Sequence, residues 1–424
     1  MSRLPCEMYD KVNYMCRKYM DRMARFELVY DFRIDEKAFK ATADGFLKKA
    51  PVFRSVVVKN PITPYWKTAD YRVEDMVSVS EPEDIEAARK EFFMQEIPTN
   101  NNVQIKIALF YSGNKTYVSF IWNHMGMDGG GFKQFWLDFC RNYTAYVNEG
   151  KAPTDFADGP RGYKEIYADM DKEKCRKAKS QFANVSLKDN HKFPFTPESE
   201  HDSKVLVVKN VEPEFFEKAR IACKQRGATV NDMLITAYMH AFGKMTNMKS
   251  DESLSVSCAT DLRRHLKDFN RIGYTNHVSF SQCYIENKGE SISETLDAVM
   301  KSMDKIKKDP FMGLHGLPLL NIAYKTMIYA QAEPIVKLFY RNPTLSVSNV
   351  GNIDVKGFSL CGNEPVGAFV AGAAKNKPCA VMTALTINGR LSVSMCLNGN
   401  EEDEKLIKRF FDEFEKAIVE LALL

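Results

Sequence analysis

The chain has 424 residues, of which 45% are hydrophobic and 27% charged, a composition that excludes a fibrous, low-complexity or mostly disordered protein. At roughly 150 residues per domain, the length predicts two or three domains with a core that needs no disulfides. The net charge of +4 is too small to indicate a nucleic-acid-binding protein, because phosphates demand a concentrated basic surface.

The first part of the chain alternates predicted strands and helices. A hairpin is predicted around Ser112-Gly113-Asn114-Lys115, which separates two apolar runs. A glycine-rich loop over 123–131 leads from the second strand of this hairpin into a helix over 132–148. The other predicted elements before it are strands over 24–33, 52–59, 103–111 and 116–122, and helices over 35–49 and 84–95.

Residues 151–202 are rich in Lys, Asp, Pro and Gly, which predicts a crossover linker with some helix over 161–182. The second part contains two helices within 212–246 that break at Gly227, and Asn231 is the predicted cap of the second. The remaining predicted elements are strands over 203–211, 254–260, 277–286, 344–350, 367–374, 379–387 and 390–396, and helices over 291–308, 314–341 (interrupted at Pro334) and 401–424.

Helices mixed with adjacent strands favour an α+β fold over a doubly wound parallel sheet. The sequence has no GxGxxG after a strand and no GxxxxGK[ST], which argues against dinucleotide redox chemistry and nucleotide hydrolysis. The ten cysteines show no CxxC or zinc spacing. We expect no leader peptide, because the first residues contain no apolar segment, and no apolar run of the sequence is as long as a membrane span. We therefore expect a cytoplasmic protein with no transmembrane segment and with reduced thiols.

The loop after the hairpin carries the strongest chemical signal. His124 follows an apolar strand, and Asp128 follows four positions later, before three glycines. An imidazole held at a strand end can accept a proton near neutral pH, and glycines let another group approach closely. A structural histidine is the alternative interpretation. We expect no metal site, because the other histidines lack ligand spacing, and no phosphate cradle, because the loop lacks the lysine and hydroxyl of one.

The segment His124-Met-Gly-Met-Asp128-Gly129 resembles the HxxxDG signature of the chloramphenicol acetyltransferase-like acyltransferases. This superfamily includes nonribosomal condensation domains, alcohol acetyltransferases, wax ester synthases and polyketide-associated acyltransferases. Three further segments resemble its elements in the same order: Asp261-Leu262-Arg263, Gly273-Tyr274-Thr275-Asn276 and Ser348-Asn349-Val350-Gly351.

The resemblance implies an α+β fold of two mixed-sheet halves with an active-site tunnel between them. We expect residues 1–170 to form the N-terminal half, 171–202 the crossover linker and 203–424 the C-terminal half. The implied activity is transfer of an acyl group from a thioester to a hydroxyl or amine acceptor. The expected co-substrate is a coenzyme A thioester, the acceptor is a small alcohol or amine, and no cofactor is bound permanently.

The resemblance also implies roles for single residues. His124 would be the general base in a direct transfer without an acyl-enzyme, and Asp128 would have a structural role paired with Arg263. Gly129 would allow a tight turn after Asp128. The expected substrate-binding residues are Asn276, Ser348 and Asn349. Ser346 and Ser348 alternate to one strand face, which suits a polar lining, although ordinary strand hydroxyls are an equal alternative.

Two departures narrow the resemblance. Condensation domains carry two adjacent histidines, and Asn123 stands at the first of these positions. The DFGWG element of plant BAHD enzymes is missing, which argues against that branch. No carrier or adenylation module accompanies the sequence, so we expect a free-standing, monomeric enzyme. The open alternatives are a condensation-type enzyme that uses substrates on an acyl or peptidyl carrier protein, and an inactive relative that only binds.

Two basic runs and one apolar stretch have no assigned role. The basic runs, Lys172–Lys179 and Lys301–Lys308, are typical of solvated helix faces. The apolar stretch over 314–340 is best explained as a pair of core helices, with an acyl channel or a membrane-surface contact as alternatives.

Overall fold

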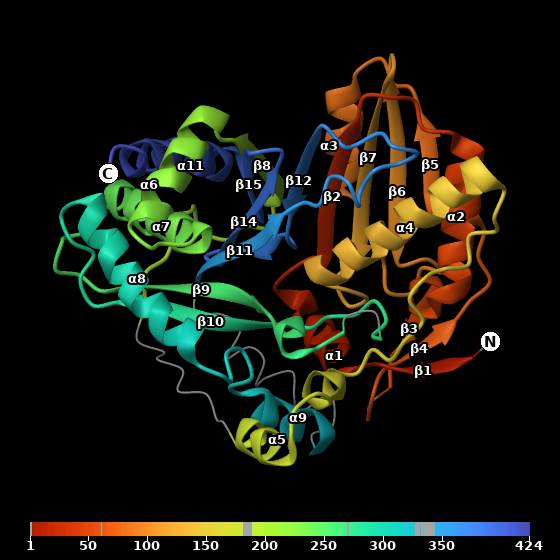
Figure 1. Cartoon of the computed structure of the whole chain (residues 1–424), viewed down its shortest axis with the longest axis horizontal. Coiled ribbons are helices and arrows are strands. Elements are labelled where there is room, and N and C mark those ends of the chain that lie inside the picture. The colour runs from red at the N-terminus through yellow and green to blue at the C-terminus, as the bar shows by residue number, and fades with distance from the viewer. Residues whose placement is uncertain (1, 61, 181–188, 269–270, 327–330, 332–343) are drawn as a thin grey trace.

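Two mixed β-sheets, each covered by helices, stand side by side in the computed structural model of the chain (Figure 1). The structure describes residues 2–424 except 61, 181–188, 269–270, 327–330 and 332–343. A small third sheet with strand order β1-β4-β3 lies close to the N-terminus. Its strands are β1 (Arg3–Pro5), β3 (Ser55–Val58) and β4 (Tyr65–Thr68), and helix α1 (Met8–Met15) follows β1.

The N-terminal sheet has five strands in the order β12-β2-β7-β6-β5. Helices α2 and α4 pack against one face in an aromatic core, and α3 packs against the other face. The strands are β2 (Met23–Tyr30), β5 (Val77–Ser80), β6 (Ile105–Ser112), β7 (Lys115–Asn123) and β12 (Gly367–Ala371), and the helices are α2 (Glu36–Lys49), α3 (Ile85–Met94) and α4 (Gly129–Glu149).

Local chemistry explains where these elements begin and end. The Asp35 carboxylate accepts a hydrogen bond from the amide of Ala38 and so caps α2. Helix α4 ends at Gly150, whose φ of 66° is the left-handed conformation that glycine adopts without strain. Phe132 of α4 stacks on Phe26 of β2 with ring centroids 4.4 Å apart, which fixes this helix against the sheet.

The C-terminal sheet has seven strands in the order β10-β9-β11-β14-β15-β13, with β8 also paired to β15. Helices α6, α7, α8 and α11 share one hydrophobic core with one of its faces. The strands are β8 (Ser203–Asn210), β9 (Leu254–Asp261), β10 (Val278–Ile285), β11 (Leu345–Asn352), β13 (Lys375–Asn376), β14 (Ala380–Ile387) and β15 (Arg390–Gly399), and the helices are α6 (Pro213–Gln225), α7 (Val230–Met245), α8 (Ile292–Lys308) and α11 (Glu401–Leu421).

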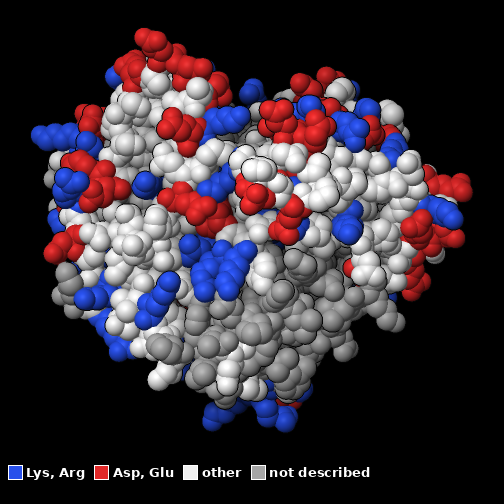
Figure 2. Space-filling view, turned by 180° about the vertical axis from the view of Figure 1, so that it is seen from behind, with Lys and Arg blue, Asp and Glu red and all other residues white. Residues whose placement is uncertain are grey.

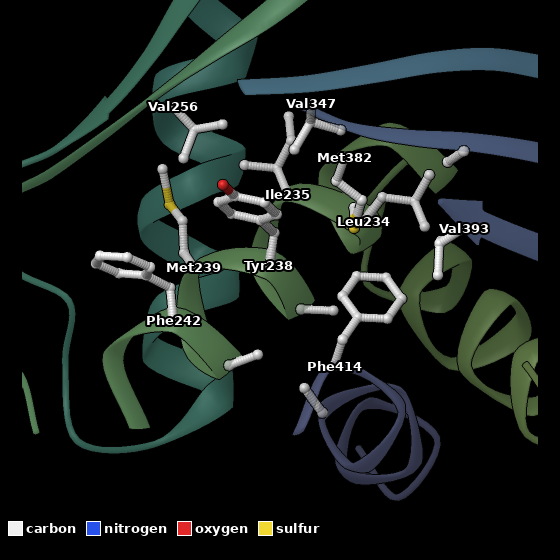
Figure 3. Packing of buried hydrophobic residues seen from close by; sticks show 14 of the residues in the cluster. Leu234, Ile235, Tyr238, Met239, Phe242, Val256, Val347, Met382, Val393 and Phe414 are labelled. Atoms are coloured by element: carbon white, nitrogen blue, oxygen red, sulfur yellow. The ribbon is translucent and has the colours of Figure 1, made fainter. Parts of the chain in front are cut away.

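Helix α7 lies at the centre of this core (Figure 3). Twelve of its 16 residues are buried, because it packs between the sheet and α11. Figure 3 shows side chains of α7, such as Tyr238 and Leu234, beside Val347 and Met382 from the strands and Phe414 from α11. A helix that is mostly apolar on all sides is buried in a protein core, which explains why α7 lies between the sheet and α11 and not at the surface.

Strand β12 joins the two sheets. It follows β11 of the C-terminal sheet in the sequence, yet it pairs antiparallel with β2 of the N-terminal sheet, from Gly367 opposite Val29 to Ala371 opposite Arg25. The chain then returns to the C-terminal sheet through β13 and β14. The N-terminal sheet is therefore completed by a strand that comes from the C-terminal part of the sequence.

The predicted α+β fold with two mixed-sheet halves is confirmed, and so is the hairpin β6–β7. Three local predictions are wrong. Thr229, and not Asn231, caps α7. Residues 51–54 form a 3₁₀ turn before β3, where a continuous strand over 52–59 was predicted. The three glycines after Asp128 form the first turn of α4, where a loop was predicted.

Some elements of the fold were missed by the sequence predictions, and others match a prediction only in part. Strands β1, β4 and β5 and helix α1 were missed, because each is short or has too few apolar positions to show a period. The helix predicted over 161–182 corresponds to a short 3₁₀ turn, η4 (Tyr163–Tyr167), and to helix α5 (Lys172–Lys179), and residues 181–182 of that prediction lie outside the described residues. Helix α9 (Leu317–Thr326) covers the start of the apolar stretch, and residues 327–330 and 332–341 of that prediction, with Pro334, lie outside the described residues.

Candidate active site

His124 lies where the two halves meet. It directly follows β7, and its amide donates a hydrogen bond to the carbonyl oxygen of Arg22 at 2.8 Å, next to the start of β2. Its imidazole faces Asn276, which comes from the C-terminal part of the sequence just before β10. A strand end in one half is thus held in contact with a loop of the other half.

Asn276 determines which nitrogen of His124 carries the proton. Its Nδ2 donates to the carbonyl oxygens of His124 at 2.8 Å and Met125 at 3.1 Å, which fixes the orientation of the amide. The Oδ1 atom then lies 3.1 Å from Nδ1 of His124. Because a carbonyl oxygen can only accept, Nδ1 donates to it, and Nε2 keeps the lone pair. The imidazole is therefore arranged as a base at Nε2.

The Asn276 side chain is only 1% exposed, and both of its polar atoms bond to the protein. These contacts support a positioning role for Asn276, and a direct contact with substrate stays a prediction. Buried polar groups are hydrogen-bonded, and here both the oxygen and the nitrogen of the amide contact the His124 segment. Its role in the structure is to position His124.

The backbone of the loop 124–127 is held by side chains from outside the loop. Arg161 donates from Nη2 to the carbonyl oxygen of Gly126 at 2.9 Å, and the indole of Trp122 donates to that of Met127 at 2.9 Å. With the two bonds from Asn276, each carbonyl oxygen of residues 124–127 accepts a side-chain hydrogen bond. A loop with all of its acceptors engaged in this way holds the imidazole in one position.

Sequence reasoning missed Arg161. Its Nη1 and Nη2 atoms each lie 3.0 Å from a carboxylate oxygen of Asp10 in α1, and its Nε donates to the carbonyl oxygen of Tyr274 at 2.8 Å. Asp10 is fully buried and also accepts from the indole of Trp66 at 2.8 Å. One guanidinium therefore joins α1, the His124 loop and the segment before β10. No local pattern signals this, because Arg161 and Asp10 are 151 positions apart.

Asp128 pairs with Arg263, as the resemblance implied. Their side chains are 5% and 7% exposed, and the two Arg263–Asp128 contacts measure 2.9 and 3.1 Å. Asp128 also caps α4 by accepting from the amide of Gly131 at 2.7 Å, and it accepts from the amide of His277 at 2.7 Å. Burial raises the pKa of Asp128, but the charge and hydrogen bonds of Arg263 outweigh burial, so its pKa lies below its ordinary value.

All acceptor positions of Asp128 are used within the protein, so it holds the loop, the helix start and β10 together and takes no part in proton transfer. Arg263 also donates to the carbonyl oxygen of Thr275 at 2.8 Å. Because Thr275 precedes Asn276, the ion pair and the residue that positions His124 belong to one continuous network.

The role predicted for Gly129 is wrong. Its φ lies outside the left-handed region, and a Cβ there would meet Val350 at an ordinary 3.5 Å. Glycine is required instead at the next two positions, Gly130 and Gly131. A Cβ on Gly130 would come within 2.6 Å of the Arg263 guanidinium, and a Cβ on Gly131 within 2.8 Å of the Thr275 carbonyl oxygen. These glycines let the ion pair and the segment before β10 approach the helix start.

His277 is a second histidine next to the ion pair, and it is completely buried. Burial lowers its pKa, the positive charge of Arg263 lowers it further, and the resulting pKa is about 4. The ring is therefore neutral at neutral pH. Neither its position nor its exposure suits contact with a substrate.

The end of β11 lies against the start of α4. Lys133 of α4 donates to the carbonyl oxygen of Val350 at 2.9 Å, next to Asn349 and near Ser348. The pairing of β11 with β14 places Ser346 and Ser348 on the same face of the sheet, opposite the face of Val347 that enters the core. The Asn349 Oδ1 accepts from the amide of Gly351 at 2.9 Å across a β-bulge. Ser348 and Asn349 are half-buried, and their substrate contacts remain predictions.

A pocket with a volume of about 1010 Å³ lies between the two halves. It is lined by Glu27 and Val29 toward the far end of β2 from His124, and by Leu206 and Ser392 of the C-terminal sheet. None of the predicted site residues lines it, so the predicted tunnel at His124 stays a prediction. In the described parts of the chain, no helix is both long and apolar enough to cross a membrane.

Comparison of the sequence with models of protein families and with curated proteins finds no match. The solved structures give a different result. A trichothecene 15-O-acetyltransferase from Fusarium sporotrichioides superposes with a TM-score of 0.70 over 98% of this chain and 95% of its own, at 14% identity. The first condensation domain of the calcium-dependent antibiotic synthetase superposes with a TM-score of 0.70 over 99% and 96%, at 14% identity.

The chain has the condensation-domain and chloramphenicol acetyltransferase-like fold. A third similar structure, polyketide synthase associated protein 5 from Mycobacterium tuberculosis, covers 96% of this chain and 96% of its own with a TM-score of 0.66 and 12% identity. The fold implied by the sequence motifs is therefore confirmed over the whole length. Identities this low establish the shared architecture and leave the chemistry to be argued from the site.

Proposed function

We propose that the protein transfers an acyl group from an acyl thioester to a hydroxyl or amine, with His124 as the general base. The observation that carries the proposal is the hydrogen bond between Nδ1 of His124 and Asn276, which leaves Nε2 as the basic nitrogen. The bonded loop and the buried Asp128–Arg263 pair support it, because both hold this imidazole in one place. Two solved structures of the same fold are named an acetyltransferase and a condensation domain, and both names describe the transfer of an acyl group.

The proposed reaction is a direct transfer. Nε2 of His124 accepts the proton of the acceptor O–H or N–H while the acceptor atom attacks the thioester carbonyl carbon. The carbonyl oxygen becomes an oxyanion, and Ser348 is the candidate donor that stabilises it. The tetrahedral species then expels the thiolate, which takes the proton from the imidazolium. One ester or amide and one free thiol result, and the enzyme returns to its starting state.

The proposed donor is a coenzyme A thioester, and the proposed acceptor is a small alcohol or amine. The second candidate function is condensation between carrier-bound substrates, which the full-length likeness to condensation domains favours. In the motif resemblance, Asn123 stands at the position of the additional histidine of those domains. Its side chain is fully buried and donates to Gln104 at 2.9 Å, so it serves the interior and supplies no second base.

The test is a thiol-release assay with a panel of acyl-coenzyme A donors and mixed alcohols and amines. We expect release above hydrolysis in the wild type and a loss of at least about 10³-fold in His124→Ala, because the base is gone. His201→Ala is the matched control, because that histidine is 89% exposed and should leave the rate unchanged. Full release by His124→Ala contradicts the mechanism.

Two further outcomes separate the alternatives. If the wild type releases no thiol from any coenzyme A donor but reacts with donors loaded on a carrier protein, the condensation function replaces acyl transfer from coenzyme A. If neither donor reacts while the folded protein still binds acyl ligands, the protein is an inactive binding relative.

A further inference from the structure

The outer side of the Arg263 segment carries a cluster of unpaired cations. Arg263 belongs to the 3₁₀ turn η5 (Leu262–His265) and points inward to Asp128, whereas the next residue, Arg264, is exposed. Consecutive Cα atoms are about 3.8 Å apart, so this surface lies directly behind the ion pair of the candidate active site. Lys267 is exposed on the same segment.

Helix α5 brings more positive charge to this surface. Its eight residues include five basic side chains and one acidic one. Ala178 is buried in one hydrophobic cluster with Leu262 of η5 and Leu317 of α9, so α5 packs toward this cluster while its basic side chains are exposed. Figure 2 shows Lys and Arg side chains at the lower end of the molecule, which is the end that α5 occupies in Figure 1.

Electrostatic contact between the two elements is evident at His265. Burial lowers the pKa of this imidazole, and the charges of Arg264 and of Lys174 from α5 lower it further. Charges from both elements therefore act on one point of the surface. We name this group, Lys172, Lys174, Arg176, Arg264 and Lys267, the outer basic patch.

Three acidic neighbours of the outer basic patch make other contacts. Glu173 pairs with Lys177 at 2.7 Å, Asp171 caps α5, and Asp169 pairs with Arg271 at 2.9 Å. Within the described part of the chain, no cation of the patch forms a salt bridge with a carboxylate. A group of unpaired cations costs stability through self-repulsion, so an anionic ligand that meets several of them at once gains binding energy.

The structure assigns the outer basic patch as the site that binds the phosphate groups of coenzyme A, with the pantetheine arm directed past η5 toward His124. This inference rests on the proposed function. A small polyanion fits better than a carrier protein, because protein interfaces need aromatic or apolar anchors. Neither α5 nor η5, both within the described residues, has a large hydrophobic side chain among the exposed ones.

The test compares Lys174→Gln/Arg176→Gln/Arg264→Gln with the matched control Lys301→Gln/Lys305→Gln/Lys308→Gln, which removes equal charge from exposed positions on α8. Calorimetry measures binding of coenzyme A, 3′-dephospho-coenzyme A and pantetheine at low salt. We expect the patch variant to bind coenzyme A about tenfold more weakly, dephospho-coenzyme A with a smaller loss, and pantetheine unchanged. The control should bind all three as the wild type does.

Several outcomes overturn the inference. The inference fails if the patch variant binds coenzyme A as tightly as the wild type does, or if the variant loses affinity equally for coenzyme A and for pantetheine. It also fails if the wild type does not bind coenzyme A, or if the variant affects only donors carried by a protein. Turnover separates this failure from failure of the proposed function. Turnover of acyl-coenzyme A with an unchanged KM in the patch variant refutes the patch alone. Binding that depends on the patch, without acyl transfer to any acceptor, refutes the proposed function alone.

Discussion

The His124 loop and the end of β11 are the two regions assigned to the candidate active site, and they are built in opposite ways. Side chains from three other parts of the chain hold every carbonyl oxygen of residues 124–127. In β11, Asn349 accepts a local bond from the amide of Gly351, and Ser348 is half-buried on the strand face opposite the core.

This difference separates two requirements of an acyl transfer. A general base must keep one orientation, because a small displacement of the base costs much of the rate. A group that binds the developing oxyanion must keep its hydrogen-bonding capacity free until the ligand arrives. The comparison therefore predicts that changes around His124 cost stability and rate, whereas changes at Ser348 cost rate alone.

The largest effect is expected for Arg161→Ala. This change leaves Asp10 buried without its bidentate partner, and loss of one member of a buried pair costs about 3–5 kcal/mol. Urea unfolding measures the difference in the free energy of unfolding. Arg33→Ala is the control, because its pair with Glu81 is about half exposed (48% and 52%) and should contribute less than about 1 kcal/mol. Equal losses in the two variants refute the role of Arg161.

The second effect is the pH dependence contributed by His277. Its pKa is about 4 in the folded protein and 6.5 for an unperturbed histidine, so the unfolded chain binds more protons between these values. The free energy of unfolding therefore falls as the pH drops from 6.5 toward 4, by up to roughly 3 kcal/mol from this group. His240 and His265 also have lowered pKa values, so the readout is the difference from His277→Gln. His277→Gln should be less steep, and an identical slope contradicts the assignment.

The third effect concerns the imidazole of His124. Asn276→Leu removes the acceptor at Nδ1 and should lower kcat about 10- to 100-fold with little change in KM, because the wrong tautomer places a proton on Nε2. Asn276→Asp restores an acceptor, and its charge stabilises the imidazolium. We expect it to recover part of kcat and to shift the acidic limb of the pH–rate profile to higher pH. A purely structural Asn276 leaves that limb in place.

The smallest effect on stability is expected for Ser348→Ala. Its free energy of unfolding should stay within about 0.5 kcal/mol of the wild type, because no protein partner depends on this hydroxyl in the described contacts. We expect kcat/KM to fall by about tenfold or more if Ser348 donates to the oxyanion. Ser346→Ala, on the same strand face but more deeply buried, is the control. A loss of stability without a loss of rate places Ser348 among ordinary strand residues.

Features that depend on neighbouring residues could be predicted from the sequence. Asp35 begins α2 and Ser291 begins α8, because each is a short polar side chain that reaches an amide two or three positions later. The hairpin β6–β7 was predicted from the apolar runs around its turn. The pairing of Asp128 with Arg263 followed from motif resemblance and not from any local rule.

Features set by distant contacts could not be predicted. The glycines after Asp128 have a poor helix propensity, and the close approach of Arg263 and Thr275 explains why glycines stand in the first turn of α4. Asn276 resembles a binding residue in the sequence, and its burial against His124 is visible only in three dimensions. The bond from Arg161 to Asp10 joins positions that no period or cap relates.

Strand β12 has a consequence for how the chain matures. The edge of β2 at residues 25–29 stays open until residues 367–371 have been synthesised and can pair with it. Unpaired strand edges are templates for aggregation, and contacts between such distant positions slow folding. The N-terminal sheet therefore cannot complete its folding on the ribosome before the C-terminal part is synthesised. A protein truncated after β11 would expose the unpaired edge of β2, which is prone to aggregation.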